Sequence, residues 1–465
     1  MSDGLPKGPL LAFYGDDFTG STAVLEALAF AGLKTILFFD TPTEDMVKRA
    51  GDCAAIGVAG LSRAKSPHWM EQHLPAAFHS IEQFGAPLYH YKICSTFDSA
   101  PHTGSIGKAV DIGRAHFKSE AVPVFTAAPI IGRWQIFGNL FARMGQEVFR
   151  IDRHPVMMRH PVTPMDEADL VSHLSKQTDA TIGLVNWIEL TSGQGETCYR
   201  KLVEHNSRII LLDGLDDETL IRAGELMWER RSHDRFVAGS QGVNYALIAY
   251  WRSKGMIEQH FEAPKLTRVE RIAAVSGSCS IITAKQIQHA ANNGFVAIRA
   301  QSLAVLDEQN WAQEISRCTD LAVRALADGK DALIFTAEGP DDPEVKQLED
   351  VMARNKLDRE AISHRLGSGL GQMLDRIVER AHLTRAVVSG GDSSGQACLA
   401  MGLTGVTAAA TLEPSAPLCR ALSDKSHLNG LEIALKGGQM GSIDFFTKAK
   451  GVSVSRESEA LTLLP

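Results

Sequence analysis

The sequence predicts an α/β fold of two domains with mainly parallel sheets and an active site in the interdomain cleft. Short apolar runs alternate with helical patterns along the chain, and most of these runs end in glycine, hydroxyl or charged residues. A charged, aperiodic stretch, residues 253–271, interrupts this rhythm, which then restarts. The 465 residues also favour more than one domain. We place the N-terminal domain at residues 1–258 and the C-terminal domain at residues 268–465.

The first unit of the chain sets the pattern. An apolar strand beginning at Leu11 ends at Gly15 in two adjacent acids, Asp16 and Asp17, before a helix over 21–31 and a strand over 34–40. Ligands of open α/β sheets bind at the carboxyl ends of the strands. Asp17 or Thr19 could simply cap the helix. A cap uses one carboxylate, so we expect at least one of the two acids to bind a ligand or to act in catalysis.

Polar residues follow three further strands of the N-terminal half. Arg63 follows a strand over 54–59, Lys92 lies in a strand over 88–93, and Arg133 follows a strand over 122–127. A hydroxyl-rich turn after Lys92 carries Ser95, Thr96 and Asp98. Arginine and lysine hold carboxylates, while hydroxyls and acids bind alcohol groups. This edge of the sheet therefore suits a small polyhydroxy acid, although Arg63 could also be a solvated loop charge.

The rest of the N-terminal half is less informative. Helices are predicted over 67–84, from Lys108, from Asp166 to about residue 177, and up to Trp251. Strands are predicted over 181–185, 208–212 and 236–238. Residues 159–165 hold two prolines and no periodicity, so we interpret them as a loop and His160 within it as structural.

Small-residue turns follow the strands of the C-terminal half. Strands over 271–275, 332–336, 385–388 and 431–435 are predicted, and residues 276–280, 390–395 and 436–441 follow three of them. A serine- and glycine-rich turn at a helix N-terminus offers free amides to phosphate, although an ordinary tight turn is the alternative. Asp392 adds a carboxylate that could meet Mg²⁺.

Three glycines, Gly367, Gly369 and Gly371, interrupt a helical pattern over 360–382. Each costs a helix about 1 kcal/mol relative to alanine. We therefore expect a backbone or a ligand to approach the helix closely here.

Composition excludes several classes of function. The net charge of −8 argues against nucleic acid or an acidic membrane as partner, and no apolar run reaches the about 18 residues of a membrane span. The first nine residues lack the apolar region of a secretory signal. Seven scattered cysteines without a Cys-x-x-Cys pair indicate reduced thiols in the cytoplasm. No His-Glu-x-x-His motif is present, so we expect no dedicated metal centre.

The combination of sites predicts a phosphotransferase. Neither a Walker A motif nor the Rossmann glycine fingerprint is present. The predicted features are one polyhydroxy-acid site, one phosphate site and a cleft between two α/β domains. Phosphoryl transfer is the simplest reaction that needs all three. A nucleotide-linked oxidoreductase of sugar acids and a non-catalytic sugar-acid sensor remain the alternatives.

Five segments resemble the four-carbon acid sugar kinase family, and its 3-oxo-tetronate kinase branch most closely. They are Asp16-Asp17-Phe18-Thr19-Gly20, Lys92 with Cys94 to Ser99, Ser276 to Ser280, Gly390 to Gly395, and Leu435-Lys436-Gly437-Gly438. The resemblance covers nearly the whole chain in the right order. It implies an N-terminal domain that binds the acid sugar and a C-terminal domain that binds ATP.

The resemblance also implies roles for single residues. Asp16, Asp17, Arg63, Lys92, Ser95 and Asp98 would line the sugar site, and their place after the strands adds Thr96 and Arg133 to it. Asp16, Asp17 and Lys92 are the expected catalytic residues, with Asp17 as our choice for the general base. Lys92 and Arg63 would hold the substrate carboxylate or neutralise phosphoryl charge. The nucleotide site would comprise Ser276, Ser278, Gly367, Gly369, Leu370, Gly391, Asp392 and Gly438, with ATP and Mg²⁺ as cofactors and no further metal.

The resemblance implies phosphorylation of a terminal hydroxyl of a small-molecule acid sugar: a 3-oxo-tetronate, threonate or erythronate, or the branched 3-oxo-isoapionate. The segment 436–441 departs from the family's usual Lys-Ser-Gly-Asn-Phe-Gly, and residues 411–417 lack a glycine that is usual there. These departures leave the exact substrate open. The oligomeric state is also open, and a homodimer is one candidate.

Overall fold

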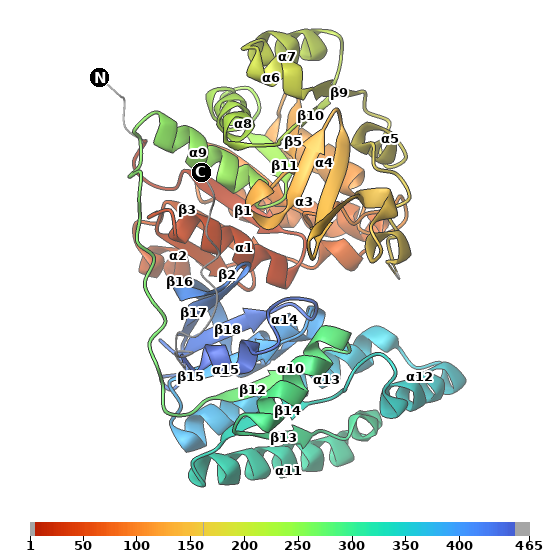
Figure 1. Cartoon of the computed structure of the whole chain (residues 1–465), viewed down its shortest axis with the longest axis vertical. Helices are drawn as coiled ribbons and strands as arrows, with labels where there is room; N and C mark the ends of the chain where they lie inside the picture. Colours follow the sequence, from red (N-terminus) through yellow and green to blue (C-terminus); the bar gives the residue numbers. More distant parts are fainter. Residues whose placement is uncertain (1–4, 161, 452–465) are drawn as a thin grey trace. The chain divides into compact units, whose positions relative to one another are not determined.

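The computed structural model describes residues 5–160 and 162–451 and confirms the α/β fold class. The chain divides into two compact units (Figure 1). Unit 1 comprises the residues up to Ala263 together with Leu403–Ala408. Unit 2 runs from Pro264 to Gly402 and resumes at Ala409. The short return of the chain to unit 1 at residue 403 was not predicted from the sequence.

Unit 1 is built on a parallel sheet with the strand order β2-β3-β1-β4-β11-β5-β10-β9. The strands are β1 (Leu11–Gly15), β2 (Thr35–Phe38), β3 (Ala55–Ala59), β4 (Leu88–Lys92), β5 (Val122–Phe125), β9 (Ile182–Val185), β10 (Ile209–Leu212) and β11 (Phe236–Gly239). Part of β16 (Leu403–Glu413) pairs antiparallel with β2, with Gly405 opposite Phe38. Because β3, β1 and β4 are adjacent and parallel, their carboxyl ends meet at one edge.

Helices surround this sheet. They are α1 (Phe18–Ala29), α2 (Glu44–Ala50), α3 (Pro67–Glu82), α4 (Ile106–Phe117), α5 (Leu170–Leu174), α6 (Trp187–Thr191), α7 (Gly195–Glu204), α8 (Asp217–Glu229) and α9 (Gly242–Ser253). Alternate residues of the strands, such as Ala12 and Tyr14 of β1, pack with α3 and α4 in one apolar cluster. Phe78 of α3 and Phe117 of α4 lie at its centre, with ring centroids 5.6 Å apart.

A small antiparallel sheet follows β5 in unit 1. It consists of β6 (Arg133–Ile136), β7 (Asn139–Met144) and β8 (Glu147–Arg150) in that order. Asp213, at the end of β10, accepts hydrogen bonds from the amides of Phe137 and Gly138 at 2.6 and 3.0 Å. The main sheet therefore anchors the turn between β6 and β7, which places Arg133 near the carboxyl edge.

Unit 2 has the strand order β13-β14-β12-β15-β18-β17-β16, parallel from β13 to β18 and antiparallel at β17. The strands are β12 (Ala273–Ser276), β13 (Phe295–Arg299), β14 (Asp331–Phe335), β15 (Arg385–Ser389), β17 (Ala416–Ser423) and β18 (Glu432–Lys436). The helices are α10 (Ile281–Asn292), α11 (Glu308–Ala327), α12 (Pro343–Asn355), α13 (Arg359–Ala381), α14 (Asp392–Met401) and α15 (Phe445–Ala449).

The helix predicted from Asp166 to about residue 177 is wrong in its bounds. Asp169 accepts hydrogen bonds from the amides of Val171 and Ser172 at 2.9 and 3.2 Å, so this cap starts α5 only at Leu170. His160 accepts a hydrogen bond from the amide of Thr163 at 3.0 Å, a local structural contact within the predicted loop. Pro161 of that loop lies outside the described residues.

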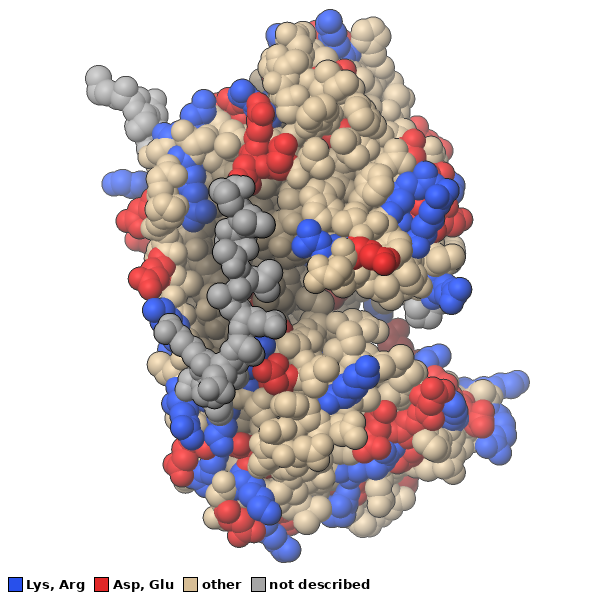
Figure 2. Space-filling model, in the orientation of Figure 1, with Lys and Arg blue, Asp and Glu red and all other residues tan. Residues whose placement is uncertain are grey.

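Charges of both signs are interspersed on the face that Figure 2 shows. Within residues 5–160 and 162–451, the structure has no helix with the length and apolar character that a membrane crossing requires.

We predict that Gly371→Ala destabilises unit 2. A Cβ atom at residue 371 would lie 2.2 Å from the carbonyl oxygen of Ala397 in α14, so α13 and α14 would have to separate. Overpacking of this kind costs about 1–3 kcal/mol of unfolding free energy, more than the gain in helix propensity. Unfolding in urea measures this loss of free energy. Gly195→Ala is the control, because a Cβ there meets Leu190 at 3.3 Å and should be tolerated. Equal stability of the two variants would contradict the packing argument.

Candidate functional site

The carboxyl ends of β3, β1 and β4 bring the first predicted site residues together. Asp16 directly follows β1, Lys92 ends β4, and Arg63 lies in a short 3₁₀ turn (Ser62–Ala64) after β3. The amide of Asp16 donates to the carbonyl of Lys92, and the amide of Arg63 donates to the carbonyl of Asp16, both at 2.9 Å. Main-chain hydrogen bonds thus fix the spacing of the three side chains.

Arg63 pairs with both acids. Its Nε and Nη2 donate to the two oxygens of Asp16 at 3.0 and 2.6 Å, and Nη2 lies 2.8 Å from Oδ1 of Asp17. Burial raises the pKa of Asp16, and the charge of Arg63 opposes that rise. Burial disfavours the guanidinium charge, but the two carboxylates outweigh burial and hold the pKa of Arg63 well above its usual value. Arg63 is therefore not a solvated loop charge.

Asp17 both caps α1 and belongs to the site. Its carboxylate accepts hydrogen bonds from the amide of Gly20 at 2.8 Å and from the hydroxyl of Thr19 at 3.1 Å. The side chain of Asp17 is 17% exposed, whereas that of Asp16 is 4% exposed. Asp17 is therefore the acid of the pair that an added molecule reaches more easily.

Lys92 lies in the same cluster. Its Nζ donates to the carbonyl of Ile93 at 2.8 Å, and burial lowers its pKa while Asp16 opposes that shift. A Cβ atom at Gly20 would lie 3.2 Å from Nζ of Lys92, 3.2 Å from Nη2 of Arg63 and 2.1 Å from Oδ1 of Asp17. Glycine at position 20 thus leaves the space in which two cations and a carboxylate converge.

The turn after β4 places its polar groups at the same sheet edge. Phe97 has a positive φ of 63° and is buried, which reverses the chain. The hydroxyl of Thr96 donates to Asp98 at 2.6 Å and lies 3.0 Å from Sγ of Cys94. Ser95 lies half-buried in this turn.

Arg133 joins this turn from β6. Its Nη1 donates to the carbonyls of Ile131 and Gly132 at 3.3 and 2.9 Å. Burial lowers the pKa of Arg133, while Cys94 and Asp98 act in the opposite direction. Its buried Nε has no hydrogen-bond partner in the described residues. Arg133 therefore keeps an unused donor near Asp98, which suits an anionic ligand.

Several supporting residues were missed from the sequence. Nε2 of His173 lies 2.9 Å from the hydroxyl of Ser99, and the side-chain amide of Gln177 donates to that hydroxyl at 2.9 Å. Asn244, in the first turn of α9 after β11, is fully buried, and within the described residues neither of its amide atoms has a partner. His173 and Asn244 carry no local motif, since their relevance comes only from tertiary contacts.

The serine and glycine turns of unit 2 also converge, because β12, β15 and β18 are adjacent and parallel. Ser276 ends β12 and is buried, and a Cβ atom at Gly438 would lie 2.6 Å from the hydroxyl oxygen of Ser278. The hydroxyls of Ser280 and Thr283 both donate to the carbonyl of Gly438, the latter at 2.8 Å. The turns after β12 and β18 are thus joined.

Lys436 organises the last turn. Its Nζ donates to the hydroxyl of Thr283 at 3.2 Å and to the carbonyls of Gly437 and Met440 at 3.0 and 3.2 Å. Burial lowers its pKa to about 8. Lys436 belongs to one of the five segments that resemble the kinase family, but the sequence did not predict it as a site residue.

The glycines of α13 contact protein. A Cβ atom at Gly369 would lie 2.5 Å from the ring of Trp311, and one at Gly367 would lie 2.7 Å from Cβ of Gln396 in α14. Leu370 is buried. The expected close approach is therefore made by α11 and α14, and direct contact of these residues with a nucleotide stays a prediction.

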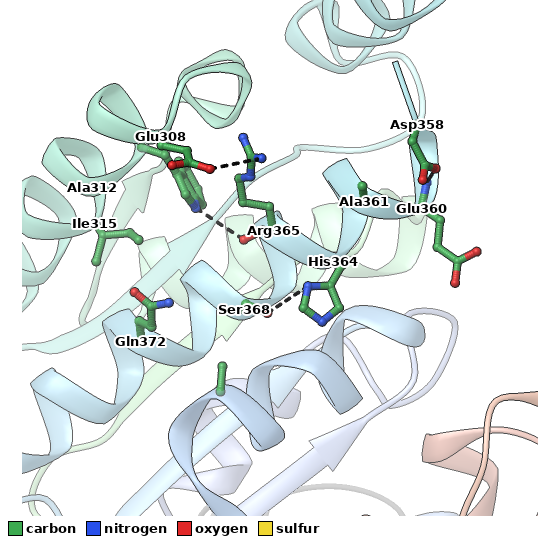
Figure 3. Close-up of a pocket in the computed structure, with 12 residues that line it drawn as sticks. Glu308, Ala312, Ile315, Asp358, Glu360, Ala361, His364, Arg365, Ser368 and Gln372 are labelled. Atoms are coloured by element: carbon green, nitrogen blue, oxygen red, sulfur yellow. Dashed lines mark hydrogen bonds and ion pairs between the residues drawn. The ribbon is translucent and has the colours of Figure 1, made fainter. Parts of the chain in front are cut away.

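An open pocket of about 940 Å³ lies beside these glycines. His364, Arg365, Ser368 and Gln372 of α13 line it together with Trp311 of α11 (Figure 3). The indole Nε1 of Trp311 donates to the carbonyl of Arg365 at 3.3 Å. Trp311 is itself almost fully buried, so the surface that the pocket offers to a ligand comes mainly from the polar side chains of α13.

Gly391 and Asp392 begin α14. A Cβ atom at Gly391 would meet no atom within 4 Å, so the backbone here is open to an added group. The side chain of Asp392 lies outside the described part of the structure, and its predicted contact with Mg²⁺ stays a prediction.

Two domain families match this chain. A sugar-binding N-terminal domain matches residues 11–247, and a nucleotide-binding C-terminal domain matches residues 273–446.

Curated relatives extend over nearly the whole chain. The 3-oxo-isoapionate kinase of Paraburkholderia graminis is 44% identical over 95% of this chain and 94% of its own length. The 3-oxo-tetronate kinase of Cupriavidus necator is 28% identical over 96% of this chain and 97% of its own.

Solved structures share the fold. A Haemophilus influenzae protein superposes with a TM-score of 0.68 at 22% identity, covering 95% of this chain and 99% of that chain. A Salmonella typhimurium protein described as a tRNA synthase gives a TM-score of 0.74 at 22% identity, covering 94% and 98%. At this identity the likeness shows the fold alone.

We predict that Asp16 and Arg63 are strongly coupled in stability. Arg63→Met leaves the buried Asp16 carboxylate without its bidentate partner, and we expect a loss of about 2–3 kcal/mol in unfolding free energy, because Arg63 is only partly enclosed. The double variant Asp16→Asn/Arg63→Met should be at least about 1 kcal/mol more stable than the sum of the two single losses predicts. A double-mutant cycle in urea measures this coupling, and strictly additive losses would contradict it.

We also predict that unit 1 loses stability in mild acid. Burial lowers the pKa of His90 to about 3 and that of His173 to about 4, whereas both are near 6.5 when unfolded. The unfolded chain therefore binds more protons as the pH falls below 6.5, so this stability is present above pH 6.5 and lost below it. Each histidine should therefore lower the free energy of unfolding by about 2 kcal/mol at pH 5.

Urea unfolding at pH 8 and pH 5 tests this expectation. The variant His173→Gln should lose about 2 kcal/mol of the pH dependence between pH 8 and pH 5, because it removes one buried protonation site. A pH dependence as steep as that of the unchanged chain would show that His173 does not contribute.

Proposed function

Because this chain belongs to the four-carbon acid sugar kinase family, we propose that it transfers a phosphoryl group from ATP to a terminal hydroxyl of a small acid sugar. Its kinase relatives match it along almost the whole length and make it a sugar-acid kinase. The proposal adds the identity of the nucleotide, the class of the substrate and the roles of individual residues. The observation that carries it is the cluster of Asp16, Asp17, Arg63 and Lys92 at one sheet edge.

Unit 1 binds the acid sugar in this proposal. Arg133, with its unused buried Nε, pairs with the substrate carboxylate. Asp98, Thr96 and Ser95 bind its hydroxyl groups. Arg63 already contacts both acids, so its main part is to hold Asp16 and Asp17 in place beside the substrate.

Asp17 is the proposed general base. It is more exposed than Asp16, whose two oxygens both accept hydrogen bonds from Arg63. The attacking hydroxyl would give its proton to Asp17 as its oxygen bonds to phosphorus. Lys92, buried beside Gly20, would stabilise the negative charge that develops on the transferred group.

Unit 2 binds the nucleotide in this proposal. The turns at Ser276, Ser278, Gly391 and Gly438 face phosphate groups with backbone amides and hydroxyls. The pocket of Figure 3, with Trp311, His364 and Ser368, takes the base and sugar of the nucleotide. Mg²⁺ bound with ATP would neutralise phosphate charge, with Asp392 as its expected protein ligand. The expected closure of the two domains stays a prediction.

The proposed substrate is a 3-oxo acid sugar. The 44% identical relative is a kinase of 3-oxo-isoapionate, whereas the 3-oxo-tetronate kinases of Cupriavidus necator and Burkholderia multivorans are each 28% identical. We therefore place the branched 3-oxo-isoapionate first and linear 3-oxo-tetronates second.

A coupled assay of ADP release tests the proposed function. The purified chain with ATP and Mg²⁺ should release ADP with 3-oxo-isoapionate or 3-oxo-tetronates and not without an acid sugar. Asp17→Asn should lower kcat about 10²-fold or more, because it removes the base. Asparagine is as good a helix cap as aspartate, so the fold should persist.

Asp166→Asn is the control, since this acid is exposed and we assign it no role. Full turnover by a folded Asp17→Asn protein would overturn the base assignment. Reduction of a nicotinamide cofactor, or ligand binding without ADP release, would favour the oxidoreductase or the sensor instead.

A further inference from the structure

Two histidines and a glutamate gather where α3 and α4 end. These helices pack side by side against one face of the unit 1 sheet (Figure 1). His79 and Glu82 lie one turn apart at the end of α3, and His116 lies in the last turn of α4. One ligand atom from each residue lies within 4.8 Å of those of the other two.

This cluster is separate from the kinase machinery. The carboxyl-edge residues Arg63 and Asp98 precede α3 and α4, whereas the cluster lies at the far ends of both helices. The 16 residues of α3 span about 24 Å. The proposed function uses none of the three side chains.

Two of the three side chains are already in contact. Nε2 of His116 lies 3.1 Å from Oε2 of Glu82, so a single proton joins them. Nε2 of His79 lies 3.4 Å from the side-chain amide nitrogen of Gln83. A metal bound through this nitrogen would replace the contact with Gln83.

The neighbouring arginine approaches the other oxygen of the glutamate. Arg235 lies 3.8 Å from Oε1 of Glu82, on the oxygen that His116 does not contact. His116 and Glu82 are partly buried, with side-chain exposures of 19% and 31%, and His79 is exposed. His116 and Glu82 are thus held by their surroundings, and a metal ion can enter from the exposed side, at His79.

We propose that His79, Glu82 and His116 form a Zn²⁺ site that clamps α3 to α4. Two imidazoles and one carboxylate are a ligand set that zinc accepts, with water in the fourth position. Ca²⁺ and Mg²⁺ require oxygen ligands and would bind poorly here. Zinc competes with protons for imidazole nitrogens in general, so its binding weakens as the pH falls.

The sequence pattern does not show this site. His79 and Glu82 form a short His-x-x-Glu pair, but the third ligand lies 34 residues further on from Glu82. Only the packing of α3 against α4 brings His116 to the pair. The expectation of no dedicated metal centre was based on contiguous motifs, which detect ligands supplied by one helix.

Isothermal titration of the chelator-treated full-length chain with ZnCl₂ at pH 7.5 tests the proposal. We expect one Zn²⁺ per chain and a melting temperature that rises with zinc concentration, because zinc binds only the folded state. His79→Ala should weaken zinc binding at least about tenfold. His79 is exposed, so this variant should fold normally.

His73→Ala is the matched control, because His73 is an exposed histidine of the same helix outside the cluster. It should bind zinc as the unchanged chain does. Glu82→Gln gives a second test and should also weaken binding. Equal zinc affinity of His79→Ala and the unchanged chain, or equal losses in His79→Ala and His73→Ala, would overturn the proposal. ADP release should be unaffected by His79→Ala, which separates this test from that of the kinase activity.

Discussion

The buried pairing of Asp16 with Arg63 is the constraint on which the unit 1 site depends. A carboxylate exposed by only 4% at the end of a strand is costly unless a cation meets it. Arg63 meets both of its oxygens and reaches Asp17 as well, so one guanidinium fixes two adjacent acids. The charge and hydrogen bonds of Arg63, with a further contribution from Lys92, offset the cost of burial. The same contacts that stabilise the sheet edge therefore also orient the acid that we propose as base.

Main-chain geometry determines which side chains can take part. The strand order β3-β1-β4 brings Arg63, Asp16 and Lys92 to neighbouring positions although they are far apart in the sequence. Asp17 then starts α1, and Gly20 keeps the first turn of that helix open. Asp17 therefore caps the helix and also belongs to the site, so the two interpretations of this residue are compatible.

Much of the fold, and the gathering of polar residues at the sheet edges, could be predicted from the sequence, because apolar runs that end in polar turns are local signals. The strands that carry Asp16, Lys92 and Ser276 are found close to their predicted bounds. The antiparallel strands β6 to β8, β16 and β17 were missed, since their pairing depends on partners elsewhere in the chain, such as Asp213 for the turn after β6. The pairing of Arg63 with both acids was missed for the same reason, since no local pattern distinguishes a paired arginine from a solvated one.

The glycines show most clearly where sequence reasoning reaches its limit. Gly367 and Gly369 look like ligand contacts in the sequence, yet a Cβ atom at either position would collide with α14 or with Trp311. At Gly438 the missing Cβ makes room for the hydroxyl of Ser278. Gly391 differs from these three, because no atom lies within 4 Å of where its Cβ would be. Protein packing explains the other three glycines but not Gly391, so among these four glycines the start of α14 is the point where the backbone is most open to a phosphate.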